Sequence, residues 1–275
     1  MTDPFWDLVQ QRSAAAHASG VMYRIESEPF LVKDGGVDFV VRQYIDFEGQ
    51  VARQPKSKPG NPFDDPEPEL FVADLSPTHM ALLNKYHVIE THLLVVTKRY
   101  VDQTVLLDQD DFDAVARCFP DHAPAMFFYN AGRESGASQP HKHLQLVTLP
   151  MAPWADIPME PLLGAEPPRL AFPHAFARSG MNEPSRLREA YRALLDEAGI
   201  HASASPEGER QSEPYNLLVT RDWMLLVPRS RDKFEGFSVN SLAYAGALLV
   251  RNPQQLDAVR RVGPMGVLSQ VGRIS

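Results

Sequence analysis

Apolar and polar positions along this chain predict a mixture of strands and helices. Short apolar runs rich in Val, Leu and aromatic residues predict strands, whereas apolar residues spaced three and four apart predict amphipathic helices. Because strand pairs with short turns are interleaved with helices, we predict an α+β fold. The expected strands span residues 38–44, 80–85, 92–98, 125–129, 141–148, 215–220 and 223–228, and the expected helices span residues 5–19, 110–119, 183–198 and 241–250.

Two pairs of these strands predict antiparallel hairpins. Residues 80–85 and 92–98 flank a short turn segment, and residues 215–220 and 223–228 are separated by a tighter turn. The apolar runs of the two hairpins resemble each other. This similarity indicates either an internal duplication of hairpin units or the chance likeness of apolar strands.

Three segments interrupt the regular pattern. Residues 54–63 are rich in proline and basic residues, which predicts irregular backbone, and an acidic turn follows. Residues 151–173 hold many prolines and are expected to form a long surface excursion. Residues 201–213 are polar, and we expect them to be mobile.

The composition narrows the class of protein. The chain has 275 residues, of which 44% are hydrophobic, so it can form one large domain or two small ones. A formal net charge of -8 argues against a nucleic-acid-binding protein. The only cysteine is Cys118, which excludes an intrachain disulfide and a Cys-rich zinc site. The chain shows no signal-peptide pattern and no apolar run near the roughly 18 residues that span a bilayer. We therefore expect a cytoplasmic protein with no membrane partner.

One segment, from Asn130 to Gln145, carries the candidate chemistry. A loop of Gly and Ser leads into His141, His143 and Gln145, which are spaced two residues apart. Because alternate residues of a strand face the same side, these three side chains would form one polar row, with Leu144 facing the opposite side. Small residues beside that row can offer backbone N–H groups to an anion. The pattern predicts transfer of a phosphoryl or nucleotidyl group.

The residue types of this row favour a particular reaction. Imidazole is largely unprotonated at neutral pH and can attack an α-phosphate, which would give a nucleotidyl-histidine. The amide of Gln145 can hydrogen-bond to a phosphoryl oxygen but cannot activate water, so it favours a phosphate acceptor over hydrolysis. Two ordinary strand histidines, or a metal site, are the alternatives. The sequence has no third ligand at a matching spacing, so no metal site is predicted.

The run from Asn130 to Gln145 resembles the signature of diadenosine tetraphosphate phosphorylases, also called ATP adenylyltransferases, of the histidine-triad superfamily. The resemblance covers roughly residues 38 to 250, and its supporting segments are 58–63, 82–85, 92–98, 216–220, 227–230 and 238–242. It implies a histidine-triad-like antiparallel sheet with flanking helices, built as a single domain over 1–275. Within it, we expect a catalytic part, 1–163, and a C-terminal part, 185–265, that packs on the same sheet.

By this resemblance, diadenosine tetraphosphate (Ap4A) and phosphate would react reversibly to give ATP and ADP. His143 would carry AMP, His141 would orient it or contact the phosphate, and Gln145 would hold an α-phosphate oxygen. Asn84 would bond the ribose, and His92 would lie behind the site. A divalent cation such as Mg²⁺ would accompany the substrate phosphates. The residues expected to cradle the polyphosphate are Asn130, Gly132, Ser135, Gly136 and Ser138.

The sequence departs from the family pattern at Gln54, where relatives often carry lysine, so Arg53 or Lys56 would have to supply charge for the phosphates. These residues form a basic cluster with Lys58, which is either a solvated loop or a clamp for the distal phosphates. Arg229 and Ser230 follow a strand and could reach the same phosphates. An adenine pocket is also required, and its expected walls are Leu75, Leu82 and Phe71.

Other functions remain open at this point. The rivals are a uridylyltransferase of sugar phosphates, a hydrolase of dinucleoside polyphosphates, and a non-catalytic nucleotide sensor. The first usually has Cys-containing zinc sites and a proline within the triad, and this chain has neither. The intact His-x-His-x-Gln argues against the other two. The expected partners are a dinucleoside polyphosphate, ATP, ADP and phosphate, bound by a monomer or a small homo-oligomer.

Overall fold

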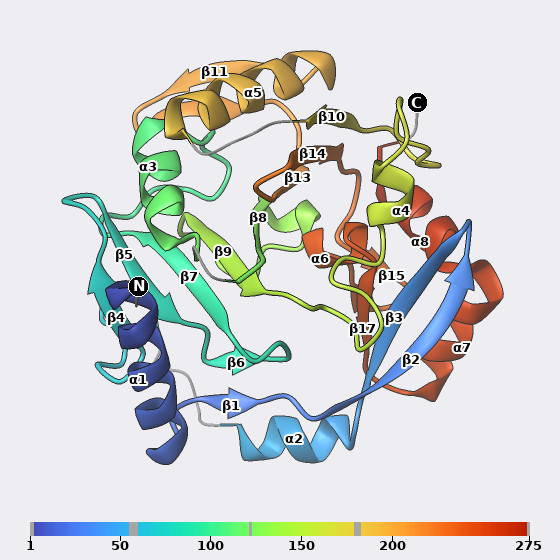
Figure 1. Ribbon diagram of the computed structural model, residues 1–275, viewed down its shortest axis with the longest axis horizontal. Coiled ribbons are helices and arrows are strands. Elements are labelled where there is room, and N and C mark those ends of the chain that lie inside the picture. Colours follow the sequence, from blue (N-terminus) through green and yellow to red (C-terminus); the bar gives the residue numbers. More distant parts are fainter. Residues whose placement is uncertain (1–2, 55–59, 121–122, 179–182, 274–275) are drawn as a thin grey trace.

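The computed structural model describes residues 3–54, 60–120, 123–178 and 183–273 (Figure 1). A sheet of eight strands runs through its centre in the order β10-β14-β13-β8-β9-β7-β5-β4, and every neighbouring pair is antiparallel. Along the chain its strands are β4 (Phe71–Asp74), β5 (His79–Leu83), β7 (His92–Thr97), β8 (Ala125–Ala131), β9 (His143–Thr148), β10 (Ala175–Arg178), β13 (Tyr215–Val219) and β14 (Trp223–Pro228).

Three helices cover one face of this sheet. They are α1 (Pro4–Ala18), α3 (Gln109–Cys118) and α5 (Pro184–Glu197). Phe112 of α3 and Leu194 of α5 pack in the same core as Leu93 and Phe127 of the sheet. Asp108 caps α3 by accepting from the backbone N–H of Asp111, whose side chain accepts in return from the backbone of Asp108. Cys118 is buried in this core.

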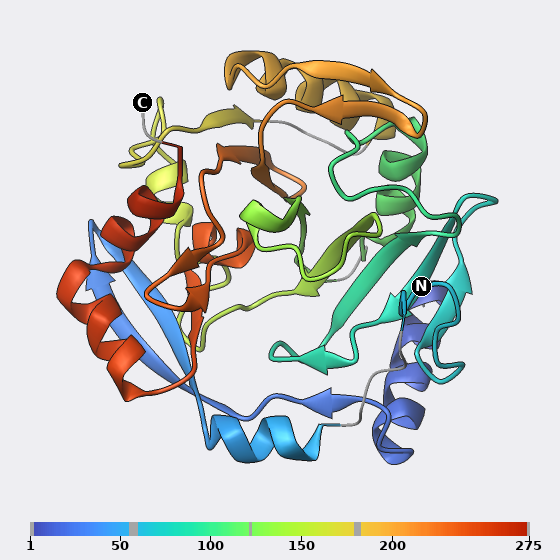
Figure 2. The ribbon, with the colours of Figure 1, turned by 180° about the vertical axis from the view of Figure 1, so that it is seen from behind.

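A second, three-stranded sheet with two helices lies over part of the opposite face. It contains β2 (Ser27–Asp34), β3 (Val37–Tyr44) and β17 (Ala247–Val250), and β17 runs parallel to β3. The N-terminal β2–β3 pair lies beside the C-terminal helices α7 (Pro253–Val262) and α8 (Pro264–Val271) in both views (Figures 1 and 2). Phe39 and Val41 pack in one apolar core with Phe128 and Leu225 of the large sheet.

A strip of this face remains polar between two apolar regions. On one side, Phe63, Leu82 and Val96 form a small cluster over β5 and β7. On the other side lies the core beneath the second sheet. His143 and Gln145 of β9 emerge between them, because Leu144 and Leu146 point into the core on the opposite face. The alternation predicted for this strand is thus confirmed.

Short elements complete the described chain. They are β1 (Tyr23–Arg24), α2 (Phe47–Arg53), β6 (Tyr86–His87), the 3₁₀ turn η1 (Arg133–Ser135), α4 (Glu160–Leu163), β11 (Ala202–Ser205), β12 (Gly208–Gln211), β15 (Lys233–Phe234), β16 (Phe237–Ser238) and α6 (Ser241–Tyr244). Across the described ranges, no helix combines the length and apolar character needed to cross a membrane.

Both predicted hairpins are confirmed, since β5 pairs with β7 and β13 pairs with β14. The helix predicted over residues 241–250 is wrong. Its first turn forms α6, but Gly246 then adopts a φ of +100°, and the chain continues as β17. A Cβ at this position would lie 2.6 Å from Pro158, so both the backbone angle and the packing require glycine here.

Two predicted loops are also more structured than expected. Residues 151–173 are not a surface excursion, because Met151, Ile157 and Phe172 are buried in the core under the second sheet. Residues 201–213 form the β11–β12 hairpin, whose backbone bonds to Thr104 and Leu106. Proline content and polarity predicted irregular backbone, but they do not reveal which apolar residues a tertiary core will bury.

Candidate active site

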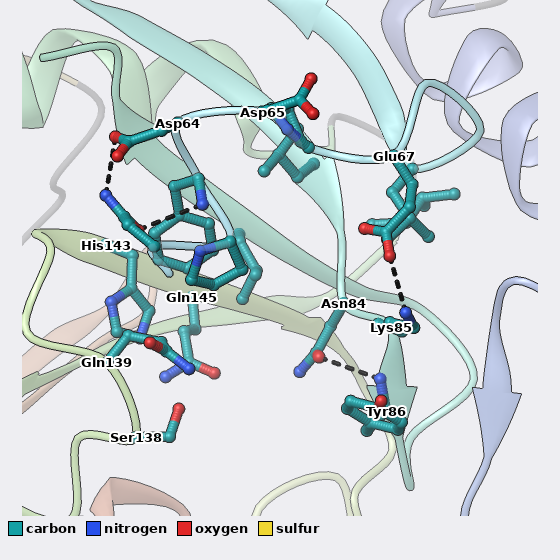
Figure 3. Close-up of a pocket in the computed structure, with 18 of the residues that line it drawn as sticks. Asp64, Asp65, Glu67, Asn84, Lys85, Tyr86, Ser138, Gln139, His143 and Gln145 are labelled. Carbon is teal, nitrogen blue, oxygen red and sulfur yellow. Dashed lines mark hydrogen bonds and ion pairs between the residues drawn. The ribbon is translucent and has the colours of Figure 1, made fainter. Parts of the chain in front are cut away.

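The polar strip opens into a cavity of about 380 Å³ (Figure 3). The loop carrying Asp64 and Glu67 runs along one side of it, opposite Ser138 and Gln139. The cavity therefore combines the Gly/Ser loop, the polar row of β9 and a second loop, which carries Asp64 and Glu67. Its apolar wall consists of Phe63, Leu70, Leu82, Leu83 and Leu94.

His143 presents one ring nitrogen to this cavity. Its Nδ1 donates to the backbone carbonyl of His141 at 2.8 Å. Since a neutral imidazole carries a single N–H, the Nε2 atom keeps its lone pair. Only 2% of the residue is exposed, and burial lowers its pKa to about 4. The ring is thus neutral at physiological pH, which is the state that a nitrogen nucleophile requires.

Gln145 is oriented by His92. The Nε2 of His92 donates to Oε1 of Gln145 at 2.9 Å, and burial lowers the pKa of His92 to about 4. The other ring nitrogen of His92 accepts from Nδ2 of Asn84 at 3.1 Å. Because the oxygen of Gln145 is held by His92, its amide N–H₂ group remains as the donor for a ligand in the cavity. Both Asn84 and Gln145 line this cavity.

His141 lies beside the cavity without lining it. Its Nδ1 accepts from Nδ2 of Asn61 at 2.8 Å, and its Nε2 donates to the carbonyl of Thr97 at 2.8 Å. The ring also packs against Phe63. With both nitrogens engaged, the ring holds the Asn61 loop onto the sheet, and only the carbonyl of His141 acts on His143. A phosphate contact by this ring would require one of these bonds to break.

The Gly/Ser loop differs in detail from the predicted cradle. The N–H groups of Gly132, Ser135, Gly136 and Ala137 all bond to carbonyls within the loop or next to it. The hydroxyl of Ser135 is buried and donates to the carbonyl of Ala131. Gly132 and Ser135 line neither described cavity, so they shape the loop. Ser138 lines both cavities, and Asn130 and Gly136 line the second one.

Asn130 belongs to a buried polar network behind the loop. Its Oδ1 accepts from Nδ2 of Asn216 at 2.9 Å and from the hydroxyl of Ser241 at 2.8 Å. Arg229 is 2% exposed and donates to Asn216 and to the carbonyl of Ser135. The expectation that Arg229 could reach the phosphates is therefore wrong, because its guanidinium is committed to backbone and amide oxygens in the interior.

The other predicted residues lie in different places. Leu82 lines the cavity, whereas Leu75 is buried in the core with the helices and Phe71 packs beside the small cluster of Phe63. Arg53 ends α2, pairs with Asp46 and lines neither cavity. Lys56 and Lys58 fall outside the described residues.

The sequence alone did not single out Asn61 and Gln103. Asn61 fixes the cavity wall to His141, and its only signal was its place in an Asn-Pro-Phe segment. Gln103 is buried and bonds to the backbone of His143, although it lies in an irregular segment far from it in the sequence. Asp64, Asp65 and Glu67, predicted only as a turn, line the cavity.

Comparison with known proteins agrees with this geometry. Residues 1–165 match the model of the Ap4A phosphorylase N-terminal domain, and residues 168–273 match that of the ATP adenylyltransferase C-terminal domain. The chain belongs to the Ap4A phosphorylase family. The family resemblance of the His-x-His-x-Gln segment is thus confirmed.

Two proteins of Saccharomyces cerevisiae are similar to this member of the family over most of their length. Diadenosine 5',5'''-P1,P4-tetraphosphate phosphorylase 2 is 28% identical, covering 90% of this chain and 88% of the yeast protein. Protein APA1 is 26% identical, covering 92% and 88%. The crystal structure of yeast Ap4A phosphorylase Apa2 in complex with Ap4A superposes with a TM-score of 0.79 over 99% of this chain and 98% of that one, at 23% identity. This likeness confirms the predicted histidine-triad-like antiparallel fold.

Proposed function

We propose that this protein catalyses the reversible phosphorolysis of Ap4A, in which Ap4A and phosphate give ATP and ADP. The family assignment supports the reaction class. The single observation that carries the proposal is the state of His143, whose Nδ1–H is held by a carbonyl while the neutral Nε2 faces the cavity.

The reaction then proceeds in two displacements. In the first, Nε2 of His143 attacks the α-phosphorus, a P–N bond forms, and the bond between the α-phosphorus and the bridging oxygen breaks, so that ATP leaves. In the second, an oxygen of inorganic phosphate attacks the same phosphorus, the P–N bond breaks, and ADP leaves. Gln145 donates its amide N–H to a non-bridging oxygen, where negative charge develops in both steps.

Mg²⁺ is proposed as a companion of the substrate. Asp64 and Asp65 line the cavity and offer carboxylate oxygens, the ligand type that this ion prefers. No group of three or more candidate ligand side chains converges anywhere in the described parts of the chain, so phosphates and water would supply most of the coordination. A bound cation would screen the charge of the polyphosphate and of these carboxylates.

Two measurements test the proposed function. Incubation with α-labelled ADP, which reverses the second displacement and releases phosphate, should leave an acid-sensitive label on the wild-type protein and none on His143→Ala; equal labelling of both would refute the nucleophile. Chromatography of the products from Ap4A should show ATP and ADP only when phosphate is present. Formation of ATP and AMP without phosphate would convert the assignment to a hydrolase.

A further inference from the structure

A second cavity, of about 430 Å³, adjoins the first. Four residues line both, namely Asn84, Tyr86, Ser138 and Gln145, so the two spaces meet beside the expected position of the α-phosphorus. One face of the three-stranded sheet forms its far wall, together with the segment around Asn240.

The register of the three-stranded sheet places two arginines in this wall. Arg42 of β3 pairs with Leu249 of β17. Tyr44 ends β3 two residues later, and Arg251 directly follows the last residue of β17. Alternate residues share a face, so all four look toward the second cavity, which they line. The intervening residues, such as Val41 and Val250, are buried in the core behind the sheet.

Neither arginine has a carboxylate partner among the described residues. Arg42 makes one long bond of 3.5 Å to the carbonyl of Met151, and the guanidinium of Arg251 lies 5.0 Å from the ring centroid of Phe47. Burial lowers the pKa of Arg42, and charge repulsion from the nearby Arg24 lowers it further. Positive charge thus accumulates at this wall of a protein whose formal net charge is -8.

The two cavities therefore differ in charge. The first combines an apolar wall with Asp64, Asp65 and the Glu67–Lys85 ion pair, which suits an uncharged nucleoside and leaves any phosphate that approaches the two aspartates dependent on a bound cation. The second offers two arginines, which suit phosphate groups. Resting on the proposed function, we infer that the second cavity binds the departing nucleotide, and that Arg42 and Arg251 hold its phosphates while the first cavity holds the transferred nucleoside.

Binding measurements test this inference without turnover. In a His143→Ala background, calorimetry should show that the pair of changes Arg42→Gln and Arg251→Gln weakens Ap4A binding by about tenfold or more, the effect of losing charge-assisted hydrogen bonds. AMP affinity should change by less than about twofold, because AMP fills the first cavity only. The matched control is Arg261→Gln. Arg261 lies on α7, is exposed to solvent and forms an ion pair with Glu235.

Three outcomes would overturn the inference: an unchanged Ap4A affinity in the double variant, an equal loss of AMP affinity, or an equal loss of Ap4A affinity in the Arg261→Gln control. Retained secondary structure and melting temperature would exclude a folding defect. A wild-type protein that binds Ap4A through the arginines but forms no ATP and ADP would instead refute the proposed function, so the two failures are distinguishable.

Discussion

The side-chain amide of Gln103 bonds to both backbone groups of His143. Its Oε1 accepts from the N–H at 2.8 Å, and its Nε2 donates to the carbonyl at 3.1 Å and to the carbonyl of Asn130 at 2.9 Å. The β8–β9 ladder ends at the pair Phe128 and Gln145, so this amide takes the place of the next ladder bonds. It spreads the two strands and fixes the backbone from which the imidazole projects.

Replacing Gln103 by Met should therefore lower kcat for Ap4A phosphorolysis. A displacement of about 1 Å at a reacting group can reduce the rate by about 10²-fold, and we expect a loss of that order with little change in KM. Steady-state kinetics at saturating phosphate measure the split. Gln103→Glu keeps the acceptor for the N–H but loses the donors, so its kcat should be intermediate. A raised KM and a lowered unfolding free energy with an unchanged kcat would indicate a purely structural role.

The pH dependence of nucleotidyl transfer should reflect the lowered pKa of His143. Because the neutral ring is the nucleophile and its pKa is about 4, single-turnover transfer from Ap4A should stay constant from pH 7.5 to pH 5.5 and fall only at lower pH. An ordinary histidine, with a pKa near 6.5, would already lose most activity at pH 5.5. Omitting phosphate from this assay removes the titration of the acceptor. An acid limb centred near 6.5 would contradict the buried, neutral ring.

Stability should also fall on acidification. His92 and His143 each have a folded-state pKa of about 4, below the value in the unfolded chain. Between about pH 6.5 and pH 4 the unfolded chain therefore binds more protons than the folded protein. The stability contributed by the neutral rings is complete above that window and declines through it, on the order of 1–3 kcal/mol for each ring. Urea titrations at pH 7 and pH 4.5 measure the change. In His92→Gln the difference between the two pH values should be smaller, and an unchanged difference would rule out this ring as a source.

Changing Gln145 to His should shift the products toward hydrolysis. An imidazole at this position can accept a proton from water, whereas the amide cannot. At a fixed phosphate concentration, the ratio of AMP to ADP should rise severalfold. Gln145→Asn, which shortens the side chain without adding a base, should lower the rate and leave the ratio unchanged. If Gln145→His gives the wild-type ratio, the account of the amide is wrong.

Removing the charge of Lys142 should destabilise the fold. Lys142 points away from the cavity and donates to Asp111 at 2.6 Å and to the carbonyl of Leu106 at 3.0 Å, and both partners of the ion pair are buried. Lys142→Met leaves the buried carboxylate of Asp111 with only His79 and the backbone N–H of Asp108 as partners, which should cost about 3–5 kcal/mol of unfolding free energy. Adding Asp111→Asn should recover part of that loss in denaturant titrations. A stable Lys142→Met protein would show that His79 suffices.

Local patterns predicted much of the fold and the centre of the site. Alternation located β9 and the side chains of His143 and Gln145, and apolar runs located both hairpins. The sequence could not reveal that Gly246 would end a helix against Pro158, because that contact depends on tertiary packing. It also misjudged part of the loop, since Gly132 and Ser135 line neither cavity and their N–H and hydroxyl groups bond to carbonyls of the loop itself. Gln103 and Arg42 reach the site only through chain folding, and neither belongs to a local motif.

The seam between β8 and β13 has a consequence for how this chain can change. β8 belongs to the N-terminal family segment and β13 to the C-terminal one, and the two strands pair by backbone hydrogen bonds. Asn130 lies opposite Asn216 in their register. Neither segment is then a module that evolution or an engineer can exchange freely. A hybrid assembled from two relatives would inherit one strand of a matched pair from each parent, and it would succeed only where those strands, and the amides between them, still complement one another.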